Sequence, residues 1–513
     1  MTGEQMPKVQ FNLQQVRDLA TKHKVVPIIE TLFSTTETPL SIFEKLAADK
    51  TGSFLLESAE QGVWARYSFV GVNNRGSLLQ NDGGEVKWHS ADGLSPLPSQ
   101  AESLDTSALG AVNQIQQAWT SEPLPGVPPL SSGLVGLLAW DVIREIEKLG
   151  PAPAKDFPSP TAAMVMFQDL VIMDHHTSNI LLVSNVFIEN GVDLNAAYED
   201  ALVRIDKMRS DLFKPSQVLL ADVDMNSKAN IQHRVSEASF IETVEKSKHF
   251  VRIGAVFQVV PSQRFDHEVS DSPLDVYRVL RALNPSPYMY LLNFQDESGD
   301  YSVVGSSPEA LVTVHEKHAV MHPIAGSRPR GLGSEQDEEF AENLLADNKE
   351  KAEHLMLVDL ARNDLLKVCE PSSVNVTEFM KIHRFSHIMH LVSTVEGQIR
   401  AGQTPIDVFK ATFPAGTLSG APKPRALEII DELESSNRGI FGGVVGYFDF
   451  AGNADVAIAI RTAFIRDGVA HVQAGAGIVL DSVPASEHAE TIAKAGAPMR
   501  AVVAANHMLR RNQ

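Results

Sequence analysis

Two pairs of glutamates stand at the same spacing in distant parts of the sequence. Glu350 and Glu353 are three residues apart, and so are Glu487 and Glu490. Because residues at i and i+3 share one face of a helix, each pair presents two carboxylates in one direction. If the two faces meet, they offer oxygen ligands to a hard cation such as Mg²⁺, which keeps several water ligands. The alternative is a solvated, ion-paired helix surface, which the neighbouring lysines favour.

An arginine in a row of alanines is the second candidate. The alternation over residues 455–464 predicts a strand whose apolar side chains face a core. Arg461 then lies on the opposite face, between Ala459 and Ala463. The open space around its guanidinium suits bidentate capture of a carboxylate ligand. An arginine at a sheet edge or on the surface fits the same pattern.

Glycine-rich segments and a histidine pair are weaker signals. Residues 414–423 and 473–477 could bring backbone N–H groups close to an anion, but neither segment has the spacing of a nucleotide-binding motif. Isolated glycine clusters are most often turns.

His387 and His390 lack nearby partners for zinc. One of them could be a general acid or base, although a packed histidine is the default interpretation.

Apolar periodicity indicates the elements that must position these residues. Helices are predicted over residues 39–49, 337–368 and 486–494. Strands are predicted over residues 53–59, 67–72, 163–173, 179–187, 288–294, 302–305 and 310–315, and an antiparallel meander over 441–450, 455–465 and 469–475. Residues 95–132, rich in Pro, Ser and Gly, predict a long surface excursion. The order of elements indicates an α+β protein with large antiparallel sheets flanked by helices, an α/β sandwich.

Length and composition narrow the class of protein. The chain has 513 residues, too many for one core, so we expect an N-terminal portion (1–215), a linker (216–238) and a second domain (239–513). A formal net charge of -20 makes nucleic acid an unfavourable partner. The one cysteine, Cys369, predicts a packed thiol in a reducing compartment. Neither a signal peptide nor a membrane span is visible, so we expect a soluble, cytoplasmic protein.

Taken together, these motifs resemble the chorismate-utilising enzymes, and within them component I of anthranilate synthase. The matching stretches are residues 257–263 (FQVVPSQ), 284–289 (NPSPYM), 305–309 (GSSPE), 323–327 (PIAGS), 352–360 (AEHLMLVDL), 416–423 (GTLSGAPK) and 473–477 (QAGAG). They follow one another in the family's order. Residues 55–59 (LLESA) resemble the family's regulatory portion. The resemblance implies the α+β fold of this family.

The resemblance also assigns roles. Glu353 and Glu490 match the Mg²⁺ ligands, and Glu350 and Glu487 match a water-mediated second layer. Substrate-binding positions are matched by Gly326, Ser327, Thr417, Phe441, Arg461, Gly475, Ala476 and Gly477. Catalytic positions are matched by Glu309 as general acid, His390 in pyruvate elimination, Lys494 with no role assigned, and Ala325. A tryptophan pocket is matched by Glu57, Ser58, Pro287, Tyr288, Met289, Val445 and Tyr447.

Ala325 separates the branches of this family. Relatives that make isochorismate, salicylate or aminodeoxychorismate carry a lysine there, and alanine can neither activate water nor act as a nucleophile. The resemblance therefore implies direct attack of ammonia on ring carbon 2 of chorismate, then loss of pyruvate to give anthranilate. Aminodeoxychorismate synthase component I and a non-catalytic tryptophan-binding regulator are the alternatives.

Partners and departures follow from the same resemblance. A glutamine amidotransferase subunit should supply ammonia, in a heterotetramer of two large and two small subunits, and L-tryptophan should be a feedback inhibitor.

Phe441 stands where relatives usually have a tyrosine, so a hydroxyl contact to substrate is missing. An asparagine that commonly precedes the lysine at 494 is Ala493 here. Both departures bear on substrate affinity rather than on the class of reaction.

Overall fold

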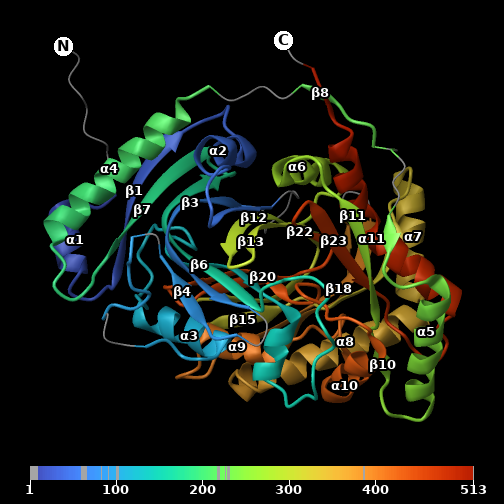
Figure 1. Ribbon diagram of the computed structural model, residues 1–513. Coiled ribbons are helices and arrows are strands. Elements are labelled where there is room, and N and C mark those ends of the chain that lie inside the picture. The colour runs from blue at the N-terminus through green and yellow to red at the C-terminus, as the bar shows by residue number, and fades with distance from the viewer. Residues whose placement is uncertain are drawn as a thin grey trace.

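Antiparallel strands build one large sheet with helices packed around it (Figure 1). The computed structural model describes residues 10–58, 66–81, 84–90, 92–99, 103–215, 220–225, 227, 231–384 and 388–511. Within these residues twenty strands belong to the large sheet, and every strand pair in it is antiparallel. The predicted α+β class is confirmed.

The first part of the chain is mostly long strands. It contains α1 (Leu13–Leu19), β1 (Val25–Phe33), α2 (Pro39–Leu46), β2 (Ser53–Glu57), β3 (Tyr67–Gln80), β4 (Lys87–His89), α3 (Ala108–Ala118), β5 (Gly133–Leu138), the 3₁₀ helix η1 (Trp140–Glu145), β6 (Ala162–Asp174), β7 (Asn179–Phe187), α4 (Leu194–Leu212), β8 (Ala221–Asp222) and β9 (Gln232–His233). The predicted strand over 179–187 is confirmed with both of its ends.

The second part alternates strands with helices. Its first elements are α5 (Glu237–Arg252), β10 (Gln258–Val259), β11 (Ser262–Glu268), α6 (Pro273–Leu283), β12 (Tyr288–Asp296), β13 (Gly299–Ser307), β14 (Ala310–His315), β15 (His318–Met321), β16 (Ile324–Pro329), α7 (Ser334–Ala346), α8 (Asn348–Leu366) and η2 (Pro371–Ser373). Then come β17 (Asn375–Arg384), β18 (Ile388–Gln398), α9 (Pro405–Thr412), β19 (Gly420–Ala421), α10 (Lys423–Leu433), β20 (Val444–Asp449), β21 (Ala454–Ile458), β22 (Thr462–Arg466), β23 (Val469–Gly475), α11 (Pro484–Asn506) and β24 (Leu509–Arg510).

Two long seams join strands from the two parts of the chain, besides the short pairings of β9 with β11 and of β8 with β24. β2 pairs with β12, and β5 pairs with β20. From β2 the sheet continues through β3, β6 and β7 to β1, and from β12 through β13, β22 and β23 to β11. Beyond β20 lie β21, β14, β15 and β18. The division at 216–238 stays a prediction, but the strands on its two sides are hydrogen-bonded to one another.

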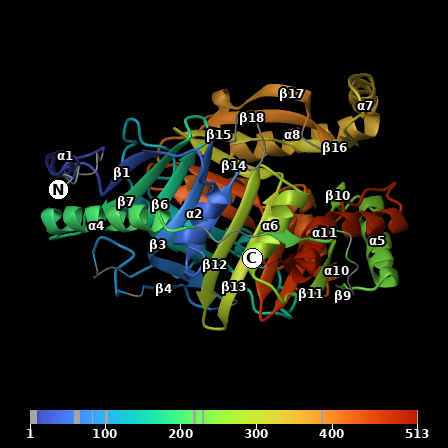
Figure 2. The same cartoon turned by 90° about the horizontal axis from the view of Figure 1, so that it is seen from above.

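Helices pack on the sheet in two groups that matter for the site. α8 packs against β16 and β18, whereas α11 packs against β23, β11 and the helices α5 and α6. Figure 2 shows α8 with β15–β18 along one side of the molecule and α5, α6 and α11 on the other. The two glutamate pairs of the sequence therefore lie on helices that belong to different layers.

The predicted single helix over 337–368 is wrong, because the structure has two helices there. Asp347, between α7 and α8, is extended (φ −71°, ψ 106°). Its carboxylate accepts the N–H groups of Lys349 and Glu350, at 3.0 and 3.3 Å. The apolar spacing runs on across this break, but the aspartate caps a new helix. The cap sets the direction in which α8 presents its glutamates.

The predicted continuous strand over 455–465 is also wrong. β21 and β22 are separate strands with different partners, β14 and β13. Between them Arg461 has φ +50°, a left-handed conformation that is uncommon for a residue with a side chain. The alternation of side chains is therefore interrupted at Arg461, and Ala457, Ala459 and Ala463 are buried rather than open to a ligand.

Residues 95–132 are not simply a surface excursion. They contain α3, whose N-cap Ser107 accepts the N–H of Gly110. Val112, Ile115 and the following Trp119 are fully buried in the core. The prediction is wrong because the prolines only flank this helix, whose apolar residues have helical spacing and are buried.

The cysteine has the environment that the sequence predicts. Cys369 is a buried free thiol, and burial raises its pKa to about 11, against the opposing charge of Arg400. It is therefore a packed, unreactive group. Among the helices that the structure describes, none is long and apolar enough to cross a membrane.

The β5–β20 seam depends on glycine at a close backbone approach. Gly136 pairs with Gly446, and a Cβ at Gly136 would lie 2.0 Å from the carbonyl oxygen of Ala163.

We predict that Gly136→Ala destabilises the protein by about 2 kcal/mol, because the strands must shift. Urea unfolding measures this change. Gly496→Ala is the control: its Cβ would meet no atom within 4 Å on α11, and we expect it to stabilise by about 0.5–1 kcal/mol. Equal effects of the two variants would contradict the role of the seam.

Candidate active site

A cavity of about 600 Å³ collects residues from distant parts of the chain. Its walls come from α8, α11, β16, β23, the loop over 284–287 and the corner at 460–461. Of the residues that the sequence singles out, it brings together Glu309, Ala325, Gly326, Ser327, Glu350, Glu353, His390, Thr417, Phe441, Arg461, Gly475, Gly477, Glu487, Glu490 and Lys494. The cavity is therefore the candidate active site.

Ala476 is the predicted substrate-binding residue that the structure does not bring to this cavity. Its side chain is fully buried in the hydrophobic core. Its N–H donates to the carbonyl of Pro261 at 3.1 Å. Neither its methyl group nor its amide is therefore directed to a ligand in the cavity.

The two glutamate pairs face the cavity from opposite helices. Burial raises the pKa of Glu350, and the negative charge of Glu353 adds to the effect. Burial likewise raises the pKa of Glu487, which the charge of Glu490 reinforces. Carboxylates that repel one another in this way favour an added cation.

The carboxylates do not already form a closed metal site. Within the described residues, no three His, Cys, Asp or Glu side chains are grouped as ligands of one metal ion. Glu353 accepts a hydrogen bond from Gln258 at 3.3 Å, and Glu490 is paired with Lys494 at 2.7 Å. The oxygen donors nevertheless fit Mg²⁺, because this ion binds through few carboxylates and retains water ligands that span the remaining gaps.

Arg461 is a largely buried cation in the wall of the cavity. In the described part of the chain, no side chain forms a hydrogen bond or ion pair with its guanidinium, and burial lowers its pKa while the charge of Glu309 opposes the shift. A buried charge without a partner is costly. The guanidinium is therefore a site for an anionic group of a ligand.

Glu309 is set to hold a proton near neutral pH. Burial raises its pKa to about 7, against a hydrogen bond from Thr417 and the positive charges of Lys494 and Arg461. The Thr417 hydroxyl donates to its Oε1 at 3.1 Å. A carboxylic acid with this pKa can donate a proton to a leaving group and recover it from water.

His390 is held as a neutral ring. Burial lowers its pKa, and the charge of Arg461 lowers it further, while the carbonyl of Gly326 opposes the shift. Its Nδ1 lies 3.1 Å from that carbonyl and 3.0 Å from the Ser327 hydroxyl. Because a carbonyl can only accept, Nδ1 carries the hydrogen, and Nε2 is the basic nitrogen of the neutral ring.

Gly326 allows β16 to lie against α8. It has φ +66°, and a Cβ there would lie 2.8 Å from Leu344 and 3.0 Å from the Glu350 carboxylate. The strand is irregular between Ala325 and Ser327, where its pairing with β18 shifts. Ala325 remains at the cavity wall as a small side chain.

Five residues of the predicted tryptophan pocket lie on three strands, β2, β12 and β20, and Ser58 and Pro287 lie next to the ends of β2 and β12. Met289 pairs with Glu57 across β12 and β2, and Ser58 follows at the end of β2. Tyr288 and Tyr447 both lie near the buried carboxylate of Asp455, to which Tyr288 is hydrogen-bonded.

Val445, the Glu57 carboxylate and Pro287 complete the description of the predicted tryptophan pocket. Val445 lies two residues before Tyr447 on β20. The Glu57 carboxylate accepts hydrogen bonds from Tyr277 and Arg281, so its charge is already paired. Only Pro287 of the group also lines the large cavity.

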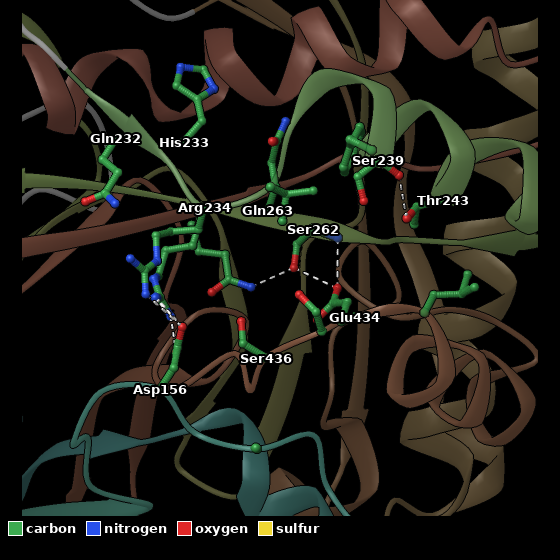
Figure 3. Close-up of a pocket in the computed structure, with 17 residues that line it drawn as sticks. Asp156, Gln232, His233, Arg234, Ser239, Thr243, Ser262, Gln263, Glu434 and Ser436 are labelled. Atoms are coloured by element: carbon green, nitrogen blue, oxygen red, sulfur yellow. Dashed lines mark hydrogen bonds and ion pairs between the residues drawn. The ribbon is translucent and has the colours of Figure 1, made fainter.

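A smaller cavity of about 330 Å³ shares one wall residue, Gln473, with the large one. Its polar groups bind one another: Arg264 contacts Asp156 at 2.6 Å. The Ser262 hydroxyl donates to Glu434 at 2.7 Å (Figure 3). Gln473 donates to Ser262 at 2.8 Å. Because these contacts satisfy the charges locally, we assign this cavity no catalytic role.

Two contacts of α8 were not predicted from the sequence. Gln258 lines the cavity and donates to Glu353, and the glycine at 477 leaves room for its amide. Lys423, at the end of a quoted motif, forms a buried ion pair with Asp364 of α8 at 2.6 Å. The position of Gln258 in the quoted stretch 257–263 was the available signal. His387 and Ala59, which the sequence also singled out, lie outside the described residues.

Glu309 should make stability depend on pH in a defined direction. Its pKa is about 7 in the folded chain against an ordinary value of 4.5, so unfolding releases a proton between these values and stability falls as pH rises through them. Glu309→Gln removes this loss. We expect the variant to gain about 3 kcal/mol relative to wild type between pH 4 and pH 8.

Urea unfolding at several pH values measures this difference. Glu242→Gln, which removes a carboxylate exposed on α5, is the matched control and should show no such gain. A difference between wild type and Glu309→Gln that stays constant with pH would show that Glu309 titrates normally.

Comparisons with known proteins show the family of the chain. The profile of the chorismate binding enzyme family matches residues 52–500. The chain is 46% identical over 497 residues to anthranilate synthase component 1 of Arthrobacter globiformis, covering 96% of this chain and 92% of the relative. It is 47% identical over 497 residues to the protein of that name from Mycolicibacterium smegmatis, covering 96% and 93%.

Solved structures give the same result. Anthranilate synthase component I from Streptococcus pneumoniae matches with a TM-score of 0.73 and 33% identity, over 85% of this chain and 93% of that one. The menaquinone-specific isochorismate synthase from Escherichia coli matches with a TM-score of 0.67 over 96% of this chain and 98% of that one, but at 17% identity it supports the fold alone. The chain belongs to the chorismate-binding enzyme family, and within it to the anthranilate synthase component 1 group.

Proposed function

We propose that this chain is the synthase subunit that aminates chorismate with ammonia and eliminates pyruvate to give anthranilate, a lyase reaction at the start of tryptophan biosynthesis. The observation that carries the proposal is one cavity that holds four glutamates, Glu309 with its raised pKa, and the Arg461 guanidinium, which has no bonded partner among the described residues. Chorismate carries two carboxylates, so a site for it needs positive charge in two places.

Different residues of the cavity would bind the two carboxylates of chorismate. Arg461 binds the enolpyruvyl carboxylate, and the backbone at Gly475 and Gly477 lies on the same wall. Glu353 and Glu490 would hold Mg²⁺ directly, with Glu350 and Glu487 holding its water ligands. The bound ion would neutralise the ring carboxylate and orient the ring.

Proton transfers are assigned to two side chains. Ammonia adds to C2 while the C4 hydroxyl leaves as water, with the proton that Glu309 donates, and the new ammonium group then loses a proton to water. Nε2 of His390 takes the C2 proton as the C3–O bond breaks, and the departing enolpyruvate takes up a proton to become pyruvate. The ring is then aromatic.

Ala325 decides the branch of the family. Its methyl group leaves space beside C2 for ammonia and supplies no amine that could attack the ring in place of ammonia. For this reason we favour anthranilate over aminodeoxychorismate as the product.

Ammonia comes from a partner in this proposal. The relatives are named component 1, which implies a second component, and the only cysteine, Cys369, is too deeply buried to be a glutaminase nucleophile. We propose a glutamine amidotransferase subunit and a heterotetramer of two large and two small subunits. A free buried thiol also suits a reducing cytoplasm.

Feedback inhibition by L-tryptophan is the regulatory part of the proposal. Glu57 and Met289 are paired across the β2–β12 seam, and Tyr288 and Tyr447 both lie near Asp455 of β21, the strand that pairs with β20. Pro287 reaches from this group to the large cavity. Tryptophan bound there would bias the chain towards a state with lower affinity for chorismate.

Activity tests the proposal directly. The purified chain with chorismate, ammonium and Mg²⁺ should produce anthranilate, followed by its fluorescence. We expect Glu309→Gln to lower kcat at least about a hundredfold, because a proton donor is lost. The kcat of wild type should fall as pH rises through about 7, where Glu309 loses its proton.

A second variant separates binding from proton transfer. Arg461→Met should raise the KM for chorismate about a hundredfold, because a charge-assisted pair is lost. Arg362→Met, a half-exposed arginine on α8, is the control and should behave as wild type. Absence of anthranilate under all conditions, or equal effects of the two arginine variants, would reject the proposal.

Inhibition is tested with the same assay. Saturating L-tryptophan should reduce the initial rate of wild type, with L-phenylalanine as the control ligand. Ser58→Leu should weaken this inhibition at least about tenfold, since the larger side chain occupies space at the end of β2. Rates that do not change at saturating tryptophan would refute the regulatory part while leaving the catalytic part standing.

A further inference from the structure

The corner that carries Arg461 is built around the hydroxyl of Thr462. That hydroxyl donates to the carbonyl of Ile460 at 2.8 Å and lies 2.6 Å from the Tyr290 hydroxyl. Because a carbonyl can only accept, the Thr462 hydrogen is committed to it, and Tyr290 is the donor of the second bond. The chain on both sides of Arg461 is therefore tied to Tyr290 through one threonine.

Tyr290 reaches Thr462 across an intervening strand. Tyr290 on β12 pairs with Gly305 on β13, and Gly305 pairs with Thr462 on β22. A Cβ at Gly305 would lie 2.1–2.5 Å from three atoms of the tyrosine side chain. The glycine therefore makes the space in which the ring lies over β13 and its hydroxyl reaches the corner.

A second contact holds the corner from the same side. The N–H of Ser306 donates to the carbonyl of Arg461 at 3.2 Å. The Ser306 hydroxyl in turn donates to the backbone carbonyl of Asn284. The side-chain amide of Asn284 donates to the same hydroxyl oxygen at 3.2 Å. The carbonyls of Ile460 and Arg461 are thus both bonded, which stabilises the left-handed backbone at Arg461.

We infer that Tyr290 is a positioning residue for Arg461, acting through Thr462 with Gly305 as the residue that admits its ring. The inference rests on the proposed role of Arg461 in binding a substrate carboxylate. Tyr290 itself is fully enclosed and does not line the cavity. Its effect on the reaction therefore passes through the direction of the guanidinium, because bidentate binding of a carboxylate depends on that direction.

A matched pair of tyrosines tests this role. Tyr290→Phe removes the hydroxyl that bonds Thr462. Tyr301→Phe is the control: Tyr301 lies on the neighbouring strand, is equally buried at 2% exposure, and its hydroxyl makes no hydrogen bond among the described residues. We expect Tyr290→Phe to raise the KM for chorismate about fivefold with kcat within about twofold of wild type, and Tyr301→Phe to leave both constants unchanged.

Thr462 gives an independent pair. Thr462→Val loses the hydroxyl and should raise KM as Tyr290→Phe does, whereas Thr462→Ser keeps it and should restore a KM near that of wild type. If Tyr290→Phe folds poorly, as judged from its melting curve, this pair carries the test. A KM for Thr462→Val equal to that for Thr462→Ser would overturn the inference.

A double-mutant cycle distinguishes positioning from general loss of stability. In an Arg461→Lys background the directed guanidinium is absent, so adding Tyr290→Phe should change KM by less than about twofold. A further fivefold rise in that background would show that Tyr290 acts elsewhere. If wild type turns over chorismate but Arg461→Lys leaves its KM unchanged, the proposed role of Arg461 fails instead, which keeps the two failures distinct.

Discussion

The uncompensated charge of Arg461 is the interaction on which the rest of the site depends. Its guanidinium is largely removed from water and has no bonded partner within the described residues. Such a group is stable only if a ligand supplies the opposite charge or if the surrounding fold holds it in place. The other walls of the cavity carry an excess of negative charge, where burial and the charges of Glu353 and Glu490 raise the pKa of Glu350 and of Glu487. One ligand with two carboxylates and one cation resolves both.

The sheet explains how these opposite charges come to one cavity. α8 and α11 belong to different layers, and the corner at Arg461 lies between strands with different partners. The β2–β12 and β5–β20 seams hold these layers together through backbone hydrogen bonds. The same β12 carries Met289, in the group that we assign to tryptophan, and Tyr290, which is tied to the corner. A regulatory ligand at the β2–β12 seam would therefore lie one residue from the Tyr290–Thr462 contact, through which we infer that Arg461 is oriented.

Much of the fold, and many of the residues that line the cavity, could be predicted from the sequence, but the geometry of the cavity could not. Alternation predicted β7 and β23 with both of their ends, because such strands bury one or both faces. The spacing of apolar residues did not predict the breaks at Arg461 and Asp347. A left-handed residue separates two strands at Arg461, and a helix cap separates two helices at Asp347, although the apolar spacing continues across both. The resemblance assigned Glu309 a role, whereas its raised pKa follows from burial that only the folded chain has. Tyr290 carried no signal, since its role depends on pairing across three strands.

The most direct measurement is the binding of Mn²⁺, as a paramagnetic substitute for Mg²⁺, followed by electron paramagnetic resonance with and without chorismate. The account predicts a single class of site that chorismate strengthens at least about tenfold, and that is lost when Glu353 and Glu490 are both replaced by alanine. Replacement of Arg461 by methionine should leave the ion bound but abolish the strengthening. Equal Mn²⁺ binding by wild type and by the double alanine variant would contradict the account, because it would place the cation outside the cavity that these helices share.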